Sequence, residues 1–191
     1  MFQDRGFLFG PFRHPASWLK DLSPYRILLM LRGPRDMLTS RYFFRAFGQP
    51  LSDDGVPWKA VRSRKKSRAR ARKLGPDRFV VEGSPAMLKI YEWYRKKLLL
   101  RPNVLFVKYE NMIQGFRGWL ASLTEYLELD VPADSYARLL QEDHFGIQDE
   151  DVYSHKRQVQ AGDHKRKLKP ETIALLNNQF REVLAALNYP E

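Results

Sequence analysis

The segment Tyr25-Arg26-Ile27-Leu28-Leu29-Met30-Leu31-Arg32-Gly33-Pro34-Arg35-Asp36 determines the fold class of this 191-residue chain. It begins with a short, almost continuous apolar run, which is typical of a strand buried on both faces in a parallel sheet. Gly33-Pro34 ends the strand, and Pro34 with an acid close behind favours the start of a helix. Apolar residues at helical spacing from Met37 to Phe47 predict that this helix continues to Gly48.

A second apolar run, residues 104–109, predicts a second strand, which leads directly into a helix. Amphipathic spacing predicts further helices over residues 87–98, 133–141 and 170–187. Two buried strands separated and followed by helices indicate an α/β fold, with a parallel sheet flanked by helices, in a single domain over residues 1–191. Two strands are too few for a complete sheet of this class, so we expect further strands in weaker segments or in a larger fold of which this chain is a piece.

Composition excludes several classes of protein. A hydrophobic fraction of 43% and an aromatic fraction of 13% exclude a wholly disordered chain. The absence of cysteine excludes disulfides, thiolate metal sites and a cysteine nucleophile. No apolar run is long enough for a membrane span or for the core of a signal peptide, so we expect a cytoplasmic protein.

The formal net charge of +11 is concentrated in one segment, because residues 59–73 hold nine basic residues and no acid. We interpret residues 49–84 as irregular, with a basic insert over about residues 52–78 that forms a mobile, solvated loop and a short edge strand at 79–81. Two alternatives remain open: a surface that attracts an acidic acceptor, or a non-specific nucleic-acid-binding segment. The basic run has no interleaved aromatic residues and no known nucleic-acid recognition motif, so sequence-specific recognition of nucleic acid is not expected.

Three polar motifs carry the candidate chemistry. Arg32 at the end of the first strand and Ser40 on the following helix could together hold a phosphate. The alternative is that Arg32 and Arg35 pair on the surface with Asp36 and glutamates. The second motif is the triplet 109–111 after the second strand. The third is the cationic segment 155–166, whose Lys156 and Arg157 could grip a phosphate or could simply be solvated.

Taken together and in this order, the three motifs resemble the family of sulfotransferases that use 3′-phosphoadenosine 5′-phosphosulfate (PAPS). The family motif Arg-Asn-Pro-Arg-Asp matches residues 32–36, with Gly33 in place of Asn and with Ser40 at the family's spacing. Tyr-Glu-Asp matches residues 109–111. Arg157 stands five residues before Gly162-Asp163, as in the family, although the family's Arg-Lys-Gly reads Arg157-Gln158-Val159 here. The resemblance runs from about residue 25 to residue 189 and leaves out the basic insert.

The resemblance implies a P-loop-NTPase-like sulfotransferase fold and transfer of a sulfuryl group from PAPS, the co-substrate, to a hydroxyl or amine acceptor without a metal. The acceptor would be a small molecule or a glycan. In the implied site, Arg32 and Ser40 bind the nucleotide 3′-phosphate, and Arg157 with Lys156 closes over it. Tyr109 contacts the adenine, and Phe145 packs on the same ring.

Two family features have no clear counterpart. The family begins with a phosphate loop that cradles the 5′-phosphosulfate, and no such loop precedes Arg32. We therefore expect either an N-terminally truncated sulfotransferase or an inactive relative that retains part of the nucleotide site. The family's general base is a histidine upstream of the first motif. His14 is the candidate for that role, and the alternative is a surface histidine whose neighbours differ from those of the family.

Overall fold

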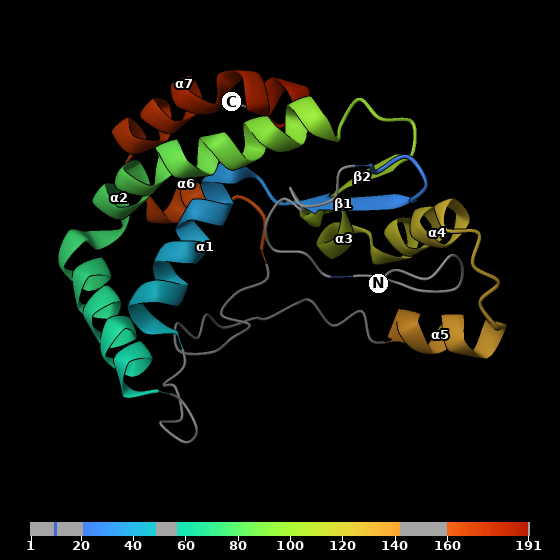
Figure 1. The fold of residues 1–191 in the computed structure, drawn as a ribbon, viewed down its shortest axis with the longest axis horizontal. Coiled ribbons are helices and arrows are strands. Elements are labelled where there is room, and N and C mark those ends of the chain that lie inside the picture. The colour runs from blue at the N-terminus through green and yellow to red at the C-terminus, as the bar shows by residue number, and fades with distance from the viewer. Residues whose placement is uncertain (1–9, 11–20, 49–56, 142–159, 191) are drawn as a thin grey trace.

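The computed structural model describes residue 10 and residues 21–48, 57–141 and 160–190. Figure 1 shows the arrangement of the elements. In chain order they are β1 (Ile27–Leu31), α1 (Pro34–Phe47), α2 (Trp58–Lys97), β2 (Val104–Lys108), α3 (Tyr109–Gln114), α4 (Phe116–Tyr126), α5 (Ala133–Gln141), α6 (Asp163–Lys167) and α7 (Pro170–Ala186). Among these helices, none combines the length and the apolar character needed to cross a bilayer.

The two predicted strands pair in parallel, with Ile27 opposite Val104 and Leu31 opposite Lys108. Within the described parts of the chain, this pair makes up the sheet. The connection from β1 to β2 runs through α1 and α2, as a parallel pairing requires. The register brings the residues that follow each strand, Arg32 and Tyr109, to the same edge of the sheet. The predicted α/β class with a parallel sheet is confirmed.

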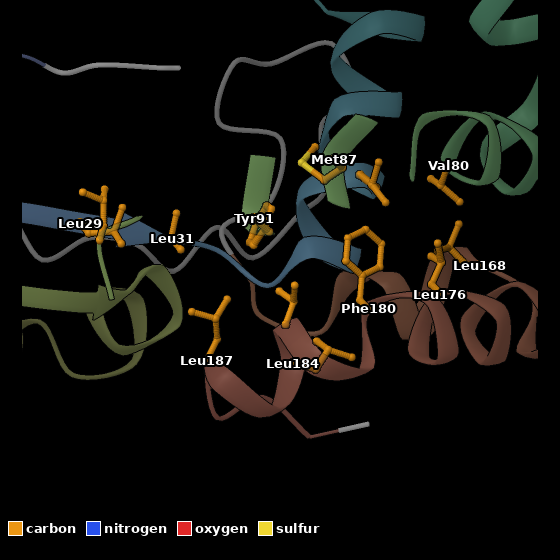
Figure 2. Packing of buried hydrophobic residues seen from close by; sticks show 13 residues of the cluster. Leu29, Leu31, Val80, Met87, Tyr91, Leu168, Leu176, Phe180, Leu184 and Leu187 are labelled. Carbon is orange, nitrogen blue, oxygen red and sulfur yellow. The ribbon is translucent and has the colours of Figure 1, made fainter. Parts of the chain in front are cut away.

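The main core lies where β1, the second half of α2 and α7 meet. In Figure 1, α2 and α7 run side by side above the strands, and α3 and α4 lie below them. Figure 2 shows Tyr91 and Met87 of α2 among the leucines of β1 and α7. Phe180 and Leu184 are completely buried, and burial of each such side chain contributes roughly 1.5–3 kcal/mol.

The interpretation of residues 49–84 as irregular is wrong for residues 58–84, which belong to α2. The basic run is helical, and residues 79–81 are part of the same helix rather than an edge strand. Lysine, arginine and alanine all have high helix propensity, so the run forms a helix once one face is buried. Ala71 provides that face, because it is completely buried against α1.

Gly75, Pro76 and Pro85 are residue types that usually break a helix, but here they shape it. Gly75 has φ 72° and ψ 171°, which divides α2 into two helical halves at a kink. Pro76 then occupies the first turn of the second half, where its missing N–H is tolerated. Pro85 cannot donate to the carbonyl of Val81, and the Ser84 hydroxyl donates to that carbonyl at 2.9 Å. The second half therefore continues through Pro85 to Lys97.

Candidate functional site

The carboxyl ends of the two strands bring Arg32 and Tyr109 together. The guanidinium carbon of Arg32 lies over the Tyr109 ring, 5.1 Å from its centroid. This cation–π contact holds the long arginine side chain at the edge of the sheet. Burial raises the pKa of Tyr109, and the nearby Arg32 charge partly offsets that rise. The pair thus presents a fixed positive charge beside a neutral aromatic ring.

Arg32 has a buried donor that meets no acceptor among the described residues. Its Nη2 donates to the carbonyl oxygen of Gln160 at 3.2 Å, and its own carbonyl accepts from the Tyr91 hydroxyl at 2.5 Å. The Nε atom is buried and has no partner among the described residues. A buried donor without an acceptor costs about 1–3 kcal/mol. Such a donor is suited to an anionic oxygen supplied by a ligand.

Glu110 joins the strand ends to the C-terminus, which the sequence analysis missed. Its Oε1 accepts from the backbone N–H of Gly33 at 2.9 Å, and its Oε2 accepts from the Tyr189 hydroxyl at 2.6 Å. Burial raises the pKa of Tyr189, as does its hydrogen bond to Glu110, so the phenol keeps its proton and donates. The Tyr-Glu-Asn motif at residues 109–111 was a signal for this residue, but the motif does not show which distant groups the carboxylate binds.

Arg35 is not the surface residue of the alternative interpretation. It is 3% exposed, and its guanidinium donates to Asn177 Oδ1 at 2.5 Å and to the carbonyl of Pro190 at 2.6 Å. It therefore anchors α7 and the residues after it to the start of α1. The surface pairing of Arg35 with Asp36 is wrong, because Asp36 is also buried and faces a different segment.

Asp36 holds the segment before α6 against α1. Its Oδ2 accepts from the Gly162 N–H at 2.7 Å, and its Oδ1 accepts from the His164 N–H at 2.8 Å and contacts His164 Nδ1 at 2.6 Å. Burial alone would raise the pKa of Asp36, but the hydrogen bonds from His164 and Gly162 lower it below its ordinary value. Gly162 has φ +76°, a left-handed conformation that favours glycine. The carboxylate thus fixes this turn.

Ser40 lies one helical turn beyond Asp36 on the same face of α1, and it is half-buried. No hydrogen bond joins its hydroxyl to another described residue, and no described contact joins it to Arg32. The structure therefore unites Arg32 and Tyr109 directly, and it places Ser40 on the helix that starts beside them. His14, Phe145, Lys156 and Arg157 lie outside the described residues. Gln160, which Arg32 contacts, follows Arg157 by three positions.

Comparisons with known proteins agree with this fold. The family model of the sulfotransferase domain matches residues 15–188. The structure is similar to the crystal structure of the mouse sulfotransferase SULT7A1 complexed with PAP, with a TM-score of 0.53 and 18% sequence identity. The match covers 83% of this chain and 58% of the mouse chain, so this chain spans less than two thirds of that protein. At this identity the likeness shows the fold alone. No curated protein sequence matches the chain.

Proposed function

The chain belongs to the sulfotransferase domain family, and we propose that it transfers a sulfuryl group from PAPS to a hydroxyl or amine acceptor. The observation that carries the proposal is the Nε atom of Arg32, a buried donor at the carboxyl end of β1 that has no partner among the described residues. In open α/β sheets, ligands bind at this edge. The sulfotransferase of similar fold is complexed with PAP, which supports a nucleotide as the ligand.

The nucleotide site is proposed as follows. Arg32 donates to the 3′-phosphate from its free Nε, and the Ser40 hydroxyl on α1 donates to the same group. Arg157 with Lys156 closes over the phosphate from the C-terminal side, and the contact of Arg32 with Gln160, three positions after Arg157, supports this part of the proposal. Tyr109 supplies a neutral ring for the adenine, and Phe145 packs on that base.

The reaction requires that the acceptor oxygen or nitrogen attack sulfur in line. The bond from sulfur to the bridging oxygen of the 5′-phosphate breaks as the bond to the acceptor forms, and the acceptor proton passes to a base. The products are the sulfated acceptor and adenosine 3′,5′-bisphosphate (PAP). We propose His14 as the base. The proposed role of Arg32 is to orient the nucleotide by binding its 3′-phosphate, a group that is distant from the reacting atoms.

An inactive relative that only binds nucleotide is the second candidate. The two candidates share the 3′-phosphate site and differ in turnover. Transfer of labelled sulfuryl groups from PAPS to hydroxyl and amine acceptors separates them. Binding of PAP without any transfer would favour the inactive relative. Transfer that is lost in His14→Ala while PAP binding is unchanged would identify the base.

Isothermal titration with PAP tests the nucleotide site directly. A lost charge-assisted hydrogen bond costs about 1.5–3 kcal/mol, so Arg32→Ala should weaken binding by roughly 10- to 100-fold. Arg41→Ala is the matched control, because Arg41 is an exposed arginine on α1, and its binding should equal that of the unmodified chain. Absence of binding at millimolar PAP, or binding that Arg32→Ala leaves unchanged, would refute the site.

A further inference from the structure

The basic run forms a cationic line along one face of the first half of α2. Its members are spaced three, four, four and three residues apart, which keeps them on one side of a helix. They are Lys59, Arg62, Lys66, Arg70 and Lys73, here called the basic stripe, and all five are exposed. At 1.5 Å per residue the stripe is about 21 Å long.

The opposite face of this half-helix is fixed to the end of α1. Ala71 is completely buried there. Arg68 donates to the carbonyl of Gly48 at 2.5 Å, and Arg72 donates to the carbonyl of Ala46 at 2.8 Å. These carbonyls belong to the C-terminal end of α1, which carries a partial negative charge. In Figure 1 the first half of α2 runs alongside α1. The docked face therefore holds the basic stripe outward.

The charge of the basic stripe is poorly balanced within the described parts of the molecule. Residues 58–73 contain no acid. Arg70 pairs with Glu82 at 2.8 Å, and the other four members make no ion pair with a described residue. Neighbouring like charges on a helix repel one another. The contacts of Arg68 and Arg72 with the end of α1 keep the helix in place in spite of this repulsion. The basic stripe is therefore suited to bind an external anion whose charges extend over a comparable length.

We propose that the basic stripe binds an acidic polysaccharide, such as a sulfated glycan chain. Its length exceeds what a small acceptor can span. Proteins that bind single-stranded nucleic acid combine cations with aromatic side chains on which bases stack, and no aromatic residue lies between Lys59 and Lys73. A polysaccharide requires only the charges. This inference rests on the proposed function where it makes the polysaccharide the acceptor, since α1 carries Ser40 of the proposed nucleotide site and also packs against the half of α2 that presents the basic stripe.

The test measures binding of fluorescent heparin oligosaccharides to the full chain at about 0.1 M salt. The stripe variant carries Lys59→Gln, Arg62→Gln, Lys66→Gln and Lys73→Gln, which preserve helix propensity. The matched control carries Arg64→Gln, Lys65→Gln, Lys89→Gln and Lys97→Gln, which removes the same charge from other exposed positions. The stripe variant should bind heparin at least about tenfold more weakly, and the control should lose less than about threefold, because attraction between a polyanion and a line of cations falls with each cation removed.

Two outcomes overturn the proposal. One is the absence of heparin binding, or a loss in the control equal to that in the stripe variant, since equal losses would show only a general effect of net charge. The other is equal or tighter binding of double-stranded DNA of matched charge with the same dependence on the basic stripe, which would assign the surface to nucleic acid. PAP titration of the same variants separates this proposal from the proposed function. If PAP fails to bind while heparin binding keeps its dependence on the stripe, only the nucleotide site is refuted.

Discussion

Asp36 shows how one carboxylate organises two distant segments. It lies in the first turn of α1, where a negative charge is favourable, and it is buried with three contacts to residues 162–164. Those residues follow directly on the segment that carries Arg157. Asp36 therefore fixes the turn that follows this segment, although its own side chain is not part of the proposed phosphate site.

The low pKa of Asp36 predicts how stability changes with pH. Burial opposes the charge, but hydrogen bonds from His164 and Gly162 keep the folded pKa below the ordinary value. The contribution is then complete above about pH 4, the value in an unfolded chain, and is lost as pH falls through the lower folded pKa. Asp36→Asn should lower the free energy of unfolding by about 1.5–3 kcal/mol at neutral pH, with a smaller difference in acid.

Urea unfolding at several pH values between about 7 and 3 measures this difference. Asp130→Asn is the control, since Asp130 is exposed and its loss should change stability by less than about 0.5 kcal/mol. A constant difference between Asp36→Asn and the unmodified chain across this range would contradict the assignment of the pH dependence to this carboxylate.

The Tyr189 hydroxyl gives a second prediction, on the stability of the fold. Its hydroxyl donates to Glu110 at 2.6 Å, and Tyr189→Phe leaves a buried carboxylate with one partner fewer. The free energy of unfolding should fall by about 1.5–3 kcal/mol. Tyr136→Phe serves as the comparison, because the Tyr136 hydroxyl has no hydrogen bond to a described residue, and urea unfolding should show little change. Equal effects of the two substitutions would argue against a role for the bond to Glu110.

Among the secondary structure elements, α2 departs most from expectation. The amphipathic pattern predicted residues 87–98, and the sequence also predicted α1, α5, α7 and both strands, whereas residues 76–84 of the second half of α2 were expected to be irregular. The first half was missed because its buried face consists of small residues such as Ala71. With nine cations in residues 59–73, the sequence shows no clear 3.6-residue period of large apolar side chains. The contacts that stabilise it, from Arg68 and Arg72 to the end of α1, join segments about 25 residues apart and leave no local signal.

The kink in α2 gives a prediction with an internal control. Gly75 has φ 72° and ψ 171°, a region open almost only to glycine, so Gly75→Ala should cost about 1–3 kcal/mol although a Cβ there meets nothing within 4 Å. Gly118 lies in α4 with open space around it, and Gly118→Ala should instead stabilise the chain by about 0.5–1 kcal/mol. Thermal unfolding of both variants measures the contrast, and stabilisation by Gly75→Ala would show that the kink is not required.

For the molecule as a whole, the candidate site was only partly predictable. The parallel register brings Arg32 and Tyr109 together, with the guanidinium carbon 5.1 Å from the ring centroid, while the roles of the two residues toward a nucleotide stay predictions. Glu110, Tyr189 and His164 were missed because each acts through a partner more than 70 positions away. A local sequence motif contains no information on these partners. The buried hydrogen bonds depend on how α7 and the turn before α6 pack against α1 and the strand ends.

The parallel register also has a kinetic consequence. Gly33 and Glu110 meet although they are 77 positions apart, and no single helix or hairpin contains both sides of the strand edge. Pairing of such distant segments requires closing a long loop, which is slow compared with helix formation. A refolding chain should therefore regain its helical signal before it regains PAP binding. PAP binding would then report the last step of folding, because the proposed nucleotide site forms only after β1 and β2 have paired.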